Sequence, residues 1–379
     1  MMAMERNRFS PLQRQALYRL AQRGALPRAV LADELGASPQ TIMRLAGALR
    51  DAGLVTERRQ SATGRGQPGL ELDYRCGALA TVGLSFSQRR VGVTLRDVSG
   101  ACLFERTIEK EFESATASLA AAEILLDEAR AASPTGCRIV GLGAAMQGYF
   151  IEVGRRVVAR SDPHGWAGLD LRRWLHDVVD VPAVIANDGR VVAGSLIADA
   201  PTRNFFAVWL GIGVGGGLVL DGALCEGTHG NAGEIGALLP YDAARPTEPN
   251  FRAAAGVDDW SDWPGLAGMA PKARARLEGW VERAAQEMSQ ALNAIMAIAD
   301  VDHVYLTSRM PTDLIEWFCT HIKWRPLGER FIRSPRDAAL QLPGPTLIVR
   351  VPRPMATLAA GLAAQQFFAD SFEEGEAHV

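Results

Sequence analysis

The sequence contains no uninterrupted run of about 18 apolar residues, which is the length that a membrane-spanning helix needs. Its first residues, MMAMERNRFSPLQRQ, lack the apolar core of a secretory signal peptide. Cysteine is scarce and scattered, and the five residues are Cys76, Cys102, Cys137, Cys225 and Cys319. Their number is odd and no two have CxxC spacing, which excludes a disulfide framework and a structural zinc site of that type. We therefore expect a cytoplasmic protein that does not enter a membrane.

Lysine is absent from residues 1–75, where all twelve basic residues are arginines. Seven acidic residues oppose them, so this segment carries a net charge of +5 and the rest of the chain a net charge of −8. A basic segment attached to an acidic remainder is typical of a protein that contacts nucleic acid at one end. A chance fluctuation over a short segment is the alternative.

The chain has 379 residues, of which 48% are hydrophobic and 22% are charged. These fractions are those of an ordinary globular protein. The length is sufficient for two or three domains, each with its own core.

Apolar spacing and capping residues predict three helices in the basic segment. The first two cover residues 11–23 and 27–35. The third begins with Ser38-Pro39 as N-cap and first-turn proline, and Gly53 ends it. A short turn that contains Gly36 joins the second and third helices, which is the arrangement of a helix-turn-helix motif.

The third helix is expected to enter the DNA major groove with its N-terminus first. The residues off its apolar stripe are Ser38, Gln40, Thr41 and Arg44, and glutamine and arginine can pair with base edges. Two extended segments then flank a glycine-rich tip, GRGQP, whose Arg65 suits a narrow minor groove. We predict a winged helix-turn-helix DNA-binding domain over residues 1–75. A three-helix head without a DNA role is the alternative.

The remainder of the chain, from residue 77, alternates between strand-like and helical segments. The strand-like segments are ALATVGLS, RVGVTLRD, ACLFERTI, RIVGLGAAM (138–146), a strand–glycine turn–strand over 204–224, DHVYLTS (302–308) and GPTLIVRVP (344–352). The helical segments cover 113–132, 168–178, 272–299 and 355–372. This order predicts an α/β body of two lobes with a ligand cleft between them. Lobe 1 covers 77–190 and is completed by 355–372, and lobe 2 covers 191–354.

Two polar residues, Asn187 and Asp188, close an apolar run over 181–186. An amide beside a carboxylate suits a polyol, because each hydroxyl both donates and accepts hydrogen bonds. Asp188 could take a proton from an attacking hydroxyl as a catalytic base, or it could hold a ligand that is only sensed. A third interpretation is that the two residues cap the helix that follows.

Five motifs, in this order, resemble the ROK family, which comprises sugar kinases and sugar-responsive repressors. They are GLGAAMQG (141–148), SDPHGW (161–166), VIANDGRVVAG (184–194), LGIGVGGG (210–217) and GTHGNAGEIGA (227–237). The resemblance covers nearly the whole chain, including the head, and implies a body of the actin-like ATPase or RNase H-like fold. It also implies that Asn187, Asp188 and Glu234 hold sugar hydroxyls. Alternatively, Glu234 is a helix-start carboxylate that faces the helix dipole.

Two of the three nucleotide elements that the resemblance implies are altered. A kinase of this family has a phosphate loop of the form G-x-D-x-G-G-T-K, and the matching segment 83–90 has Ser85 in place of the carboxylate and no paired glycines. The glycine pair expected after a late strand is replaced by Thr307-Ser308-Arg309. The third element, the glycine turn at 211–217, is present but could serve only a tight hairpin. These changes predict that the protein is not an enzyme and binds no nucleotide cofactor.

The zinc site that the resemblance implies is also missing. Ala237 replaces the histidine, and the cysteine-rich segment corresponds to LLPYDAARPTEPNFRAAAG (238–256), which has no cysteine. Since a zinc site needs about four such ligands, we predict no bound metal. The second sugar-binding glutamate has no clear counterpart, although Glu248 is a candidate, and His164 and His229 are further polar candidates.

The sequence thus predicts a transcriptional regulator, of the repressor type, for carbohydrate-related genes. We expect it to bind a palindromic double-stranded operator as a homodimer or homotetramer, and a sugar or sugar-derived effector in its body. An ATP-dependent sugar kinase with an appended head is the alternative. A regulator with a vestigial pocket that is controlled by a protein partner is a third reading.

Overall fold

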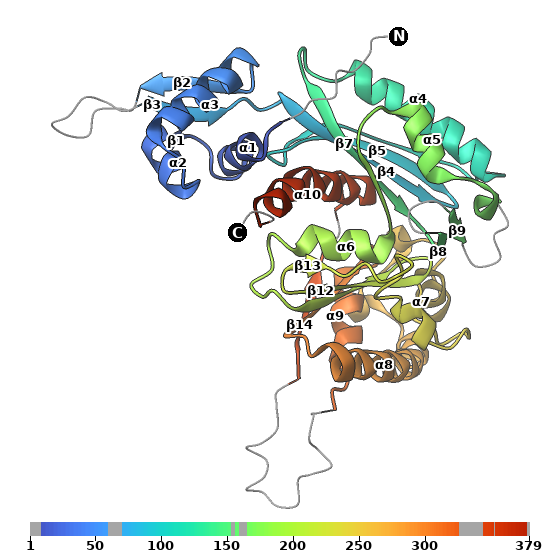
Figure 1. Cartoon of the computed structure of the whole chain (residues 1–379). Coiled ribbons are helices and arrows are strands. Elements are labelled where there is room, and N and C mark those ends of the chain that lie inside the picture. Colours follow the sequence, from blue (N-terminus) through green and yellow to red (C-terminus); the bar gives the residue numbers. More distant parts are fainter. Residues whose placement is uncertain are drawn as a thin grey trace, which may run out of the picture.

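The computed structural model describes residues 9–59, 70–152, 156–158, 165–325, 344–351 and 353–376. A head of three helices and a small sheet is followed by two lobes, each built on a five-stranded sheet (Figure 1). The C-terminal helix α10 lies between the lobes, and one of its ends lies beside the head. In these residue ranges no helix is long and apolar enough to cross a membrane.

The head contains α1 (Pro11–Arg23), α2 (Arg28–Glu34) and α3 (Pro39–Asp51), followed by β2 (Val55–Arg59) and β3 (Leu70–Tyr74). A short strand, β1 (Leu26–Pro27), pairs with β3 and was not predicted. The predicted caps of α3 are confirmed: the Ser38 hydroxyl accepts a hydrogen bond from the Thr41 N–H at 3.1 Å, and Gly53 adopts φ +71° after the last turn. The GRGQP tip with Arg65 lies outside the described residues.

Lobe 1 is built on a sheet with strand order β10-β7-β4-β5-β6. Its strands are β4 (Leu79–Ser87), β5 (Arg90–Asp97), β6 (Cys102–Glu109), β7 (Arg138–Met146) and β10 (Ala183–Asn187). Strands β4, β5 and β6 form an antiparallel meander, whereas β7 and β10 run parallel to β4. The long apolar runs of β4 and β7 fit this central position, because both faces of these strands are covered.

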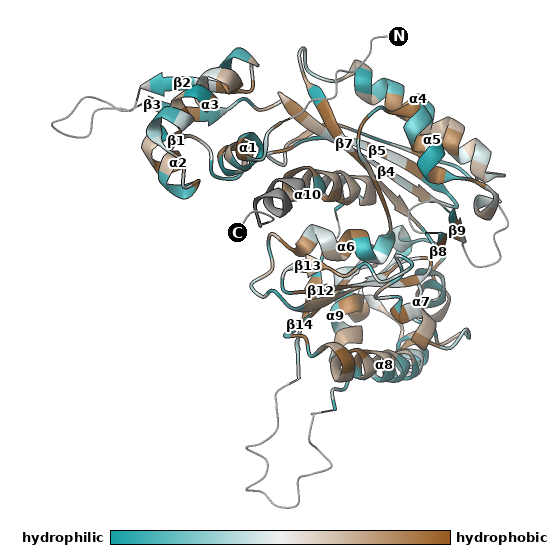
Figure 2. Cartoon of the chain, in the orientation of Figure 1, coloured by the Kyte–Doolittle hydropathy of each residue, from teal (hydrophilic) through white to brown (hydrophobic). Residues whose placement is uncertain are grey.

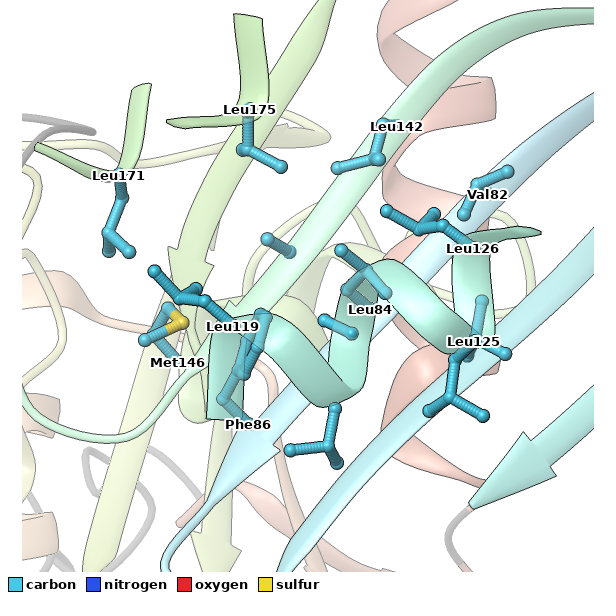
Figure 3. Packing of buried hydrophobic residues seen from close by; sticks show 14 of the residues in the cluster. Val82, Leu84, Phe86, Leu119, Leu125, Leu126, Leu142, Met146, Leu171 and Leu175 are labelled. Carbon is cyan, nitrogen blue, oxygen red and sulfur yellow. The ribbon is translucent and has the colours of Figure 1, made fainter. Parts of the chain in front are cut away.

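Two helices cover the outer face of the lobe 1 sheet, and a small hairpin closes its end. The elements are α4 (Ala115–Ala131), β8 (Tyr149–Glu152), β9 (Arg156–Val158), the 3-10 turn η1 (Trp166–Gly168) and α5 (Leu171–Val178). In Figure 3, leucines 119, 125 and 126 of α4 face the sheet residues Val82, Leu84 and Leu142. This packing buries the apolar stripe predicted for the helix over 113–132.

Lobe 2 is built on a sheet with strand order β13-β12-β11-β14-β15. Its strands are β11 (Phe205–Leu210), β12 (Val214–Leu220), β13 (Ala223–Leu224), β14 (His303–Ser308) and β15 (Thr346–Arg350). Its helices are α6 (Asp188–Leu196), which follows β10, α7 (Glu248–Ala255), α8 (Pro271–Ala299) and α9 (Thr312–Thr320), with 3-10 turns at Ile235–Leu238, Trp260–Asp262 and Leu266–Gly268. Helices α7, α8 and α9 cover the outer face, and α6 covers the face that looks toward lobe 1 (Figure 1).

The layer between the two sheets consists of α6 and α10 (Met355–Glu376). Figure 2 shows hydrophobic strand segments in the middle of each lobe and hydrophilic residues on outward helices such as α4. Gly83 of β4 and Gly143 of β7 are opposite each other in the sheet, and α10 lies directly on them. A Cβ atom on Gly143 would lie 1.9 Å from the carbonyl oxygen of Ala359, so only glycine allows this close approach.

The helices predicted at 11–23, 27–35, 113–132, 168–178, 272–299 and 355–372 are all present, with ends that differ by at most four residues. The α/β fold of two sheets with intervening and outer helices is therefore confirmed. The SDPH part of the predicted motif SDPHGW (161–166), including His164, lies outside the described residues.

Candidate functional site

The site begins where β10 ends and α6 starts. The Asn187 side chain is buried, with 3% of its surface exposed, and its Oδ1 accepts a hydrogen bond from the Arg190 N–H at 2.8 Å. This bond confirms that Asn187 caps α6, as one of the sequence interpretations held. The Nδ2 of the same side chain donates a hydrogen bond to the Glu234 carboxylate in lobe 2. Asn187 therefore both caps α6 and contacts lobe 2. Capping and participation in the site are thus not alternatives.

Asp188 is the first residue of α6 and lies at the carboxyl edge of the lobe 1 sheet. Strands β7 and β10 are parallel, so their carboxyl ends meet at the same edge, where ligands of α/β proteins bind. Gln147 follows β7 directly and forms a hydrogen bond with the Asp188 carboxylate. Gln147 was not predicted as a site residue, although its position one residue after a buried strand was a usable signal.

Glu234 is held by a loop that is tied to both lobes. Asn231 exchanges two hydrogen bonds of 2.7 Å with the backbone of Phe150 in β8. Buried Arg190 donates to the Gly230 carbonyl at 3.1 Å and to Glu226 at 3.2 Å. Asn231 and Arg190 lie within the motifs 227–237 and 184–194, yet their positioning roles are visible only in the structure.

The electrostatics of the two carboxylates reflect their partly buried position. Burial raises the pKa of Asp188 to about 7, against the opposing effects of the Arg309 charge and the Gln147 hydrogen bond. Burial also raises the pKa of Glu234 to about 7, and the hydrogen bond from Asn187 acts in the opposite direction. Near neutral pH each carboxyl group can therefore accept a hydrogen bond or donate one, which suits hydroxyl groups.

Neither of the other polar candidates in the described residues, His229 and Glu248, forms a side-chain hydrogen bond with Asn187, Asp188 or Glu234. The His229 and Ala237 residues are exposed, and Glu248 starts α7, where its N–H donates to the Gly211 carbonyl at 2.7 Å. In the described part of the chain, no three histidine, cysteine, aspartate or glutamate side chains lie close enough together to hold a metal ion. The residues brought together are thus Asn187, Asp188 and Glu234, as predicted.

Two sequence matches concern the family of this chain. The sequence profile of the ROK family matches residues 82–249 of the chain. An uncharacterized protein, y4fQ, from Sinorhizobium fredii is 31% identical over 295 residues, which are 75% of this chain and 74% of that protein. The chain belongs to the ROK family.

Solved structures show this fold in two kinds of ROK protein. A ROK family transcriptional regulator, described as a homolog of the E. coli MLC protein, has a TM-score of 0.66 at 17% identity, and the match covers 96% of this chain and 98% of that one. A ROK hexokinase from Thermus thermophilus has a TM-score of 0.55 at 19% identity, and the match covers 76% of this chain and 98% of that one. At such identities the likeness establishes the fold.

The segment at the position of the ROK phosphate loop is an ordinary β-hairpin. Ser85 pairs with Gly92 across β4 and β5, and Gln88 and Arg89 form the turn between these strands. Arg89 is exposed, and Arg90 forms an ion pair with Glu109 at 3.1 Å. Ser85, which stands where the resemblance implies a carboxylate, is therefore part of a regular pair of antiparallel strands.

The glycine turn at 211–217 serves the packing of α6. The Gly211 N–H donates to the Gly213 carbonyl at 2.9 Å and closes the turn. A Cβ atom on Gly216 would lie 2.5 Å from the Gly233 carbonyl oxygen, and one on Gly189 would lie 2.2 Å from the Gly216 nitrogen. These glycines let α6, β12 and the Glu234 loop approach one another closely, which gives them a structural role without any nucleotide.

Arg309 lies where the resemblance to the ROK family implies a glycine pair after a late strand. It follows β14, whose last residue, Ser308, donates from its hydroxyl to the Leu210 carbonyl at 2.9 Å. The Arg309 guanidinium lies over the indole ring of Trp209, with 5.7 Å between the guanidinium carbon and the ring centroid. An arginine side chain thus lies in this part of the body, near enough to Asp188 for its charge to oppose the rise of the Asp188 pKa.

In the head, the structure places Gln40, Thr41 and Arg44 on the exposed side of α3. The Ser38 hydroxyl caps the helix and lies 2.9 Å from the Thr41 hydroxyl, so it is already engaged within the protein. Met43, whose side chain is 55% exposed, adds an apolar group to the same helix. Met43 was not predicted as a contact residue, because methionine carries no polar signal for base recognition.

Proposed function

We propose that this ROK protein is a DNA-binding transcriptional regulator of the repressor type, and that its body binds a sugar or sugar-derived effector. The observation that carries the proposal is the combination of a head of three helices and an antiparallel sheet with a body in which Asn187, Asp188 and Glu234 lie together. In that body two elements for nucleotide binding are replaced by the 83–90 hairpin and by Arg309. The whole-length likeness to a ROK transcriptional regulator supports it.

The head supports a winged helix-turn-helix reading. Helices α2 and α3 are joined by a turn at Gly36, and β2 and β3 form the antiparallel pair of a wing. Gln40 and Arg44 are exposed at the start of α3, where a recognition helix reads base edges. In this proposal residues 1–75 form the DNA-binding domain, residues 77–190 with 355–372 form lobe 1, and residues 191–354 form lobe 2.

Side-chain contacts join the head to helix α10 and to strand β7 of the body. Phe9 and Tyr18 pack against Phe367 and Phe368 of α10, with ring centroids 5.7 Å and 5.2 Å apart. Arg138 of β7 donates to the Ala52 carbonyl at the end of α3 at 3.1 Å. An effector that prefers one lobe arrangement would thereby change the DNA affinity, and a coupling of about 1–3 kcal/mol is typical.

We expect Gln40→Ala and Arg44→Ala to reduce the affinity for the operator and to relax its sequence preference. A base contact of this kind contributes about 1–3 kcal/mol, which corresponds to about a 5-fold to 150-fold loss. The measurement is fluorescence anisotropy at fixed salt, with an operator selected from random DNA and a scrambled duplex of equal length.

The matched control is Arg173→Ala, because Arg173 lies on α5 of the body and its side chain is 82% exposed. This variant should bind the operator as the wild type does. Equal and weak binding of all duplexes by the wild-type protein would contradict the proposed sequence-specific regulator.

One observation favours the kinase alternative: a pKa of about 7 is what a general base at neutral pH needs, and burial gives Asp188 such a value. We nevertheless expect no sugar-dependent ADP release in a coupled assay with magnesium ATP and a sugar panel, because the phosphate elements are replaced. Sugar-dependent release by the wild type that disappears in Asp188→Asn would establish the kinase instead.

A further inference from the structure

We propose that the effector carries a negatively charged group, a phosphate or a carboxylate, and that Arg309 and Arg350 bind it beside the Asn187–Asp188–Glu234 site. This inference rests on the proposed effector function. A cavity of about 370 Å³ lies at the carboxyl ends of β14 and β15 and the first turn of α9, and both arginines line it. The cavity is large enough for a compact anionic group.

The two arginines are held in the same way. Arg309 lies over the ring of Trp209 at 5.7 Å, and Arg350 lies over the ring of Tyr305 at 5.6 Å. Both aromatic side chains are buried and belong to neighbouring strands, β11 and β14. A guanidinium that rests on an aromatic face is fixed in orientation, and its N–H groups remain available at the edge for a planar or tetrahedral anion.

Neither arginine forms an ion pair with an acidic residue in the described parts of the chain. Other arginines of the body do, including Arg90 with Glu109, Arg106 with Glu128 and Arg190 with Glu226. Desolvation lowers the pKa of Arg309, so its guanidinium is partly removed from water without a carboxylate at ion-pair distance among the described residues. A bound anion would stabilise such a charge.

Thr307 adds an independent observation in favour of a ligand. Its side chain is buried, with 3% exposed, and its hydroxyl has no hydrogen-bond partner among the described residues. Thr307 pairs in register with Trp209 on one side and with Arg350 on the other. Paired residues of parallel strands share a face of the sheet, so Thr307 lies between Arg350 and Trp209, the ring over which Arg309 lies. Buried hydroxyls normally have partners.

The place of Arg309 links the cavity to the hydroxyl-binding site. Arg309 lies over Trp209, which pairs with Gly215, and a Cβ atom on Gly215 would lie 3.3 Å from the nitrogen of Gly189, the residue after Asp188. In agreement with this placement, the Arg309 charge opposes the rise of the Asp188 pKa. A single small molecule can therefore use its hydroxyls at Asn187, Asp188 and Glu234 and its anionic group at Arg309. A phosphorylated sugar and a sugar acid share this chemistry, whereas a neutral sugar leaves Arg309 unused.

The test uses the full chain and four probes: glucose, glucose 6-phosphate, glucuronate and inorganic phosphate, each measured by calorimetry at matched ionic strength. The variants are R309Q, R350Q and R309Q/R350Q, with R173Q on α5 as a remote control, and circular dichroism confirms their folding. We expect an anionic probe to bind at least about tenfold more tightly than glucose, as a charge-assisted contact allows. R309Q should remove this difference, and R173Q should keep it.

The outcomes separate the two proposals. A gain for glucose 6-phosphate alone identifies a phosphate group, and a gain for glucuronate alone identifies a carboxylate. If glucose binds as tightly as both anionic sugars, and R309Q changes none of these affinities, the anion-site proposal is wrong. The proposed sugar effector then remains. If inorganic phosphate binds the wild type but not R309Q/R350Q, and no sugar binds, the anion-site proposal is supported and the sugar-effector proposal is wrong. If inorganic phosphate binds the wild type and R309Q/R350Q with equal affinity, the anion-site proposal is wrong.

Discussion

Gly143→Ala is expected to destabilise the protein by about 3 kcal/mol, although it adds only one methyl group. Its Cβ atom would lie 1.9 Å from the carbonyl oxygen and 2.6 Å from the carbonyl carbon of Ala359, far inside the contact distance. These atoms belong to the backbone of α10, so no side-chain rotation can relieve the clash. Overpacking a core typically costs about 1–3 kcal/mol, and displacement of a whole helix belongs at the upper end of that range.

The strand itself offers a matched control. Gly141 lies two residues earlier in β7, and a Cβ atom there would meet the nearest atom of Ala363 at 3.5 Å, an ordinary contact. Gly141→Ala should therefore leave the free energy of unfolding nearly unchanged in chemical denaturation. Equal stability of the two variants would show that the close approach of α10 to the sheet is not needed.

The consequence should extend to the head. Because Phe367 and Phe368 of α10 pack on Phe9 and Tyr18, a shift of α10 moves the surface on which α1 rests. We expect Gly143→Ala to change operator affinity even at temperatures where the protein remains folded. Gly83, opposite Gly143 in β4, should behave in the same way, since its Cβ atom would lie 1.7 Å from the Ala356 carbonyl oxygen.

These glycines show where sequence reasoning succeeds and where it ends. The strand at 138–146 and the helix at 355–372 follow from apolar runs and periodicity, which are local signals. The contact of Gly143 with Ala359 joins residues more than two hundred positions apart, and no local pattern indicates it. The sequence therefore predicts the strand and the helix. It does not predict that Gly143 allows the helix to lie directly on the strand.

The same distinction applies to the site. The resemblance to the ROK family predicts that Asn187, Asp188 and Glu234 act together, and the structure does bring them together. The residues that position them were missed, because Asn231 acts through the backbone of Phe150 and Arg190 through the Gly230 carbonyl. Arg309 was noticed only as the loss of a glycine pair, whereas its stacking on Trp209 depends on the pairing of β11 with β14.

Asp188→Asn is expected to raise stability at pH 8 while it removes effector binding. In the folded protein the pKa of Asp188 is about 7, whereas its ordinary value is 3.8, because burial disfavours the charged form. The folded state thus keeps a proton that the unfolded state releases between about pH 4 and pH 7. The free energy of unfolding must fall as the pH rises through this window, and it levels off above it.

Glu234 contributes to the same trend, since burial raises its pKa to about 7 as well. Each unit of pKa shift corresponds to about 1.4 kcal/mol, and partial exposure of both side chains reduces the effect. We therefore expect Asp188→Asn to be more stable than the wild type by about 2 kcal/mol at pH 8 and equally stable near pH 4. Asp177→Asn changes a side chain that is 65% exposed and keeps Asp188 and Glu234, so its stability should follow the same pH dependence as that of the wild type.

The two parts of this prediction have one cause. A carboxylate held partly out of water destabilises the empty protein, and a ligand hydroxyl that donates to it relieves that cost, so the same group that weakens the fold strengthens binding. Asparagine keeps the size but cannot carry the charge, and we expect at least about a hundredfold loss of effector affinity by calorimetry, because a hydrogen bond to a charged group is worth up to about 3 kcal/mol. If Asp188→Asn is less stable than the wild type at pH 8 but binds the effector with unchanged affinity, Asp188 is a structural residue. Other residues of the cleft would then bind the effector.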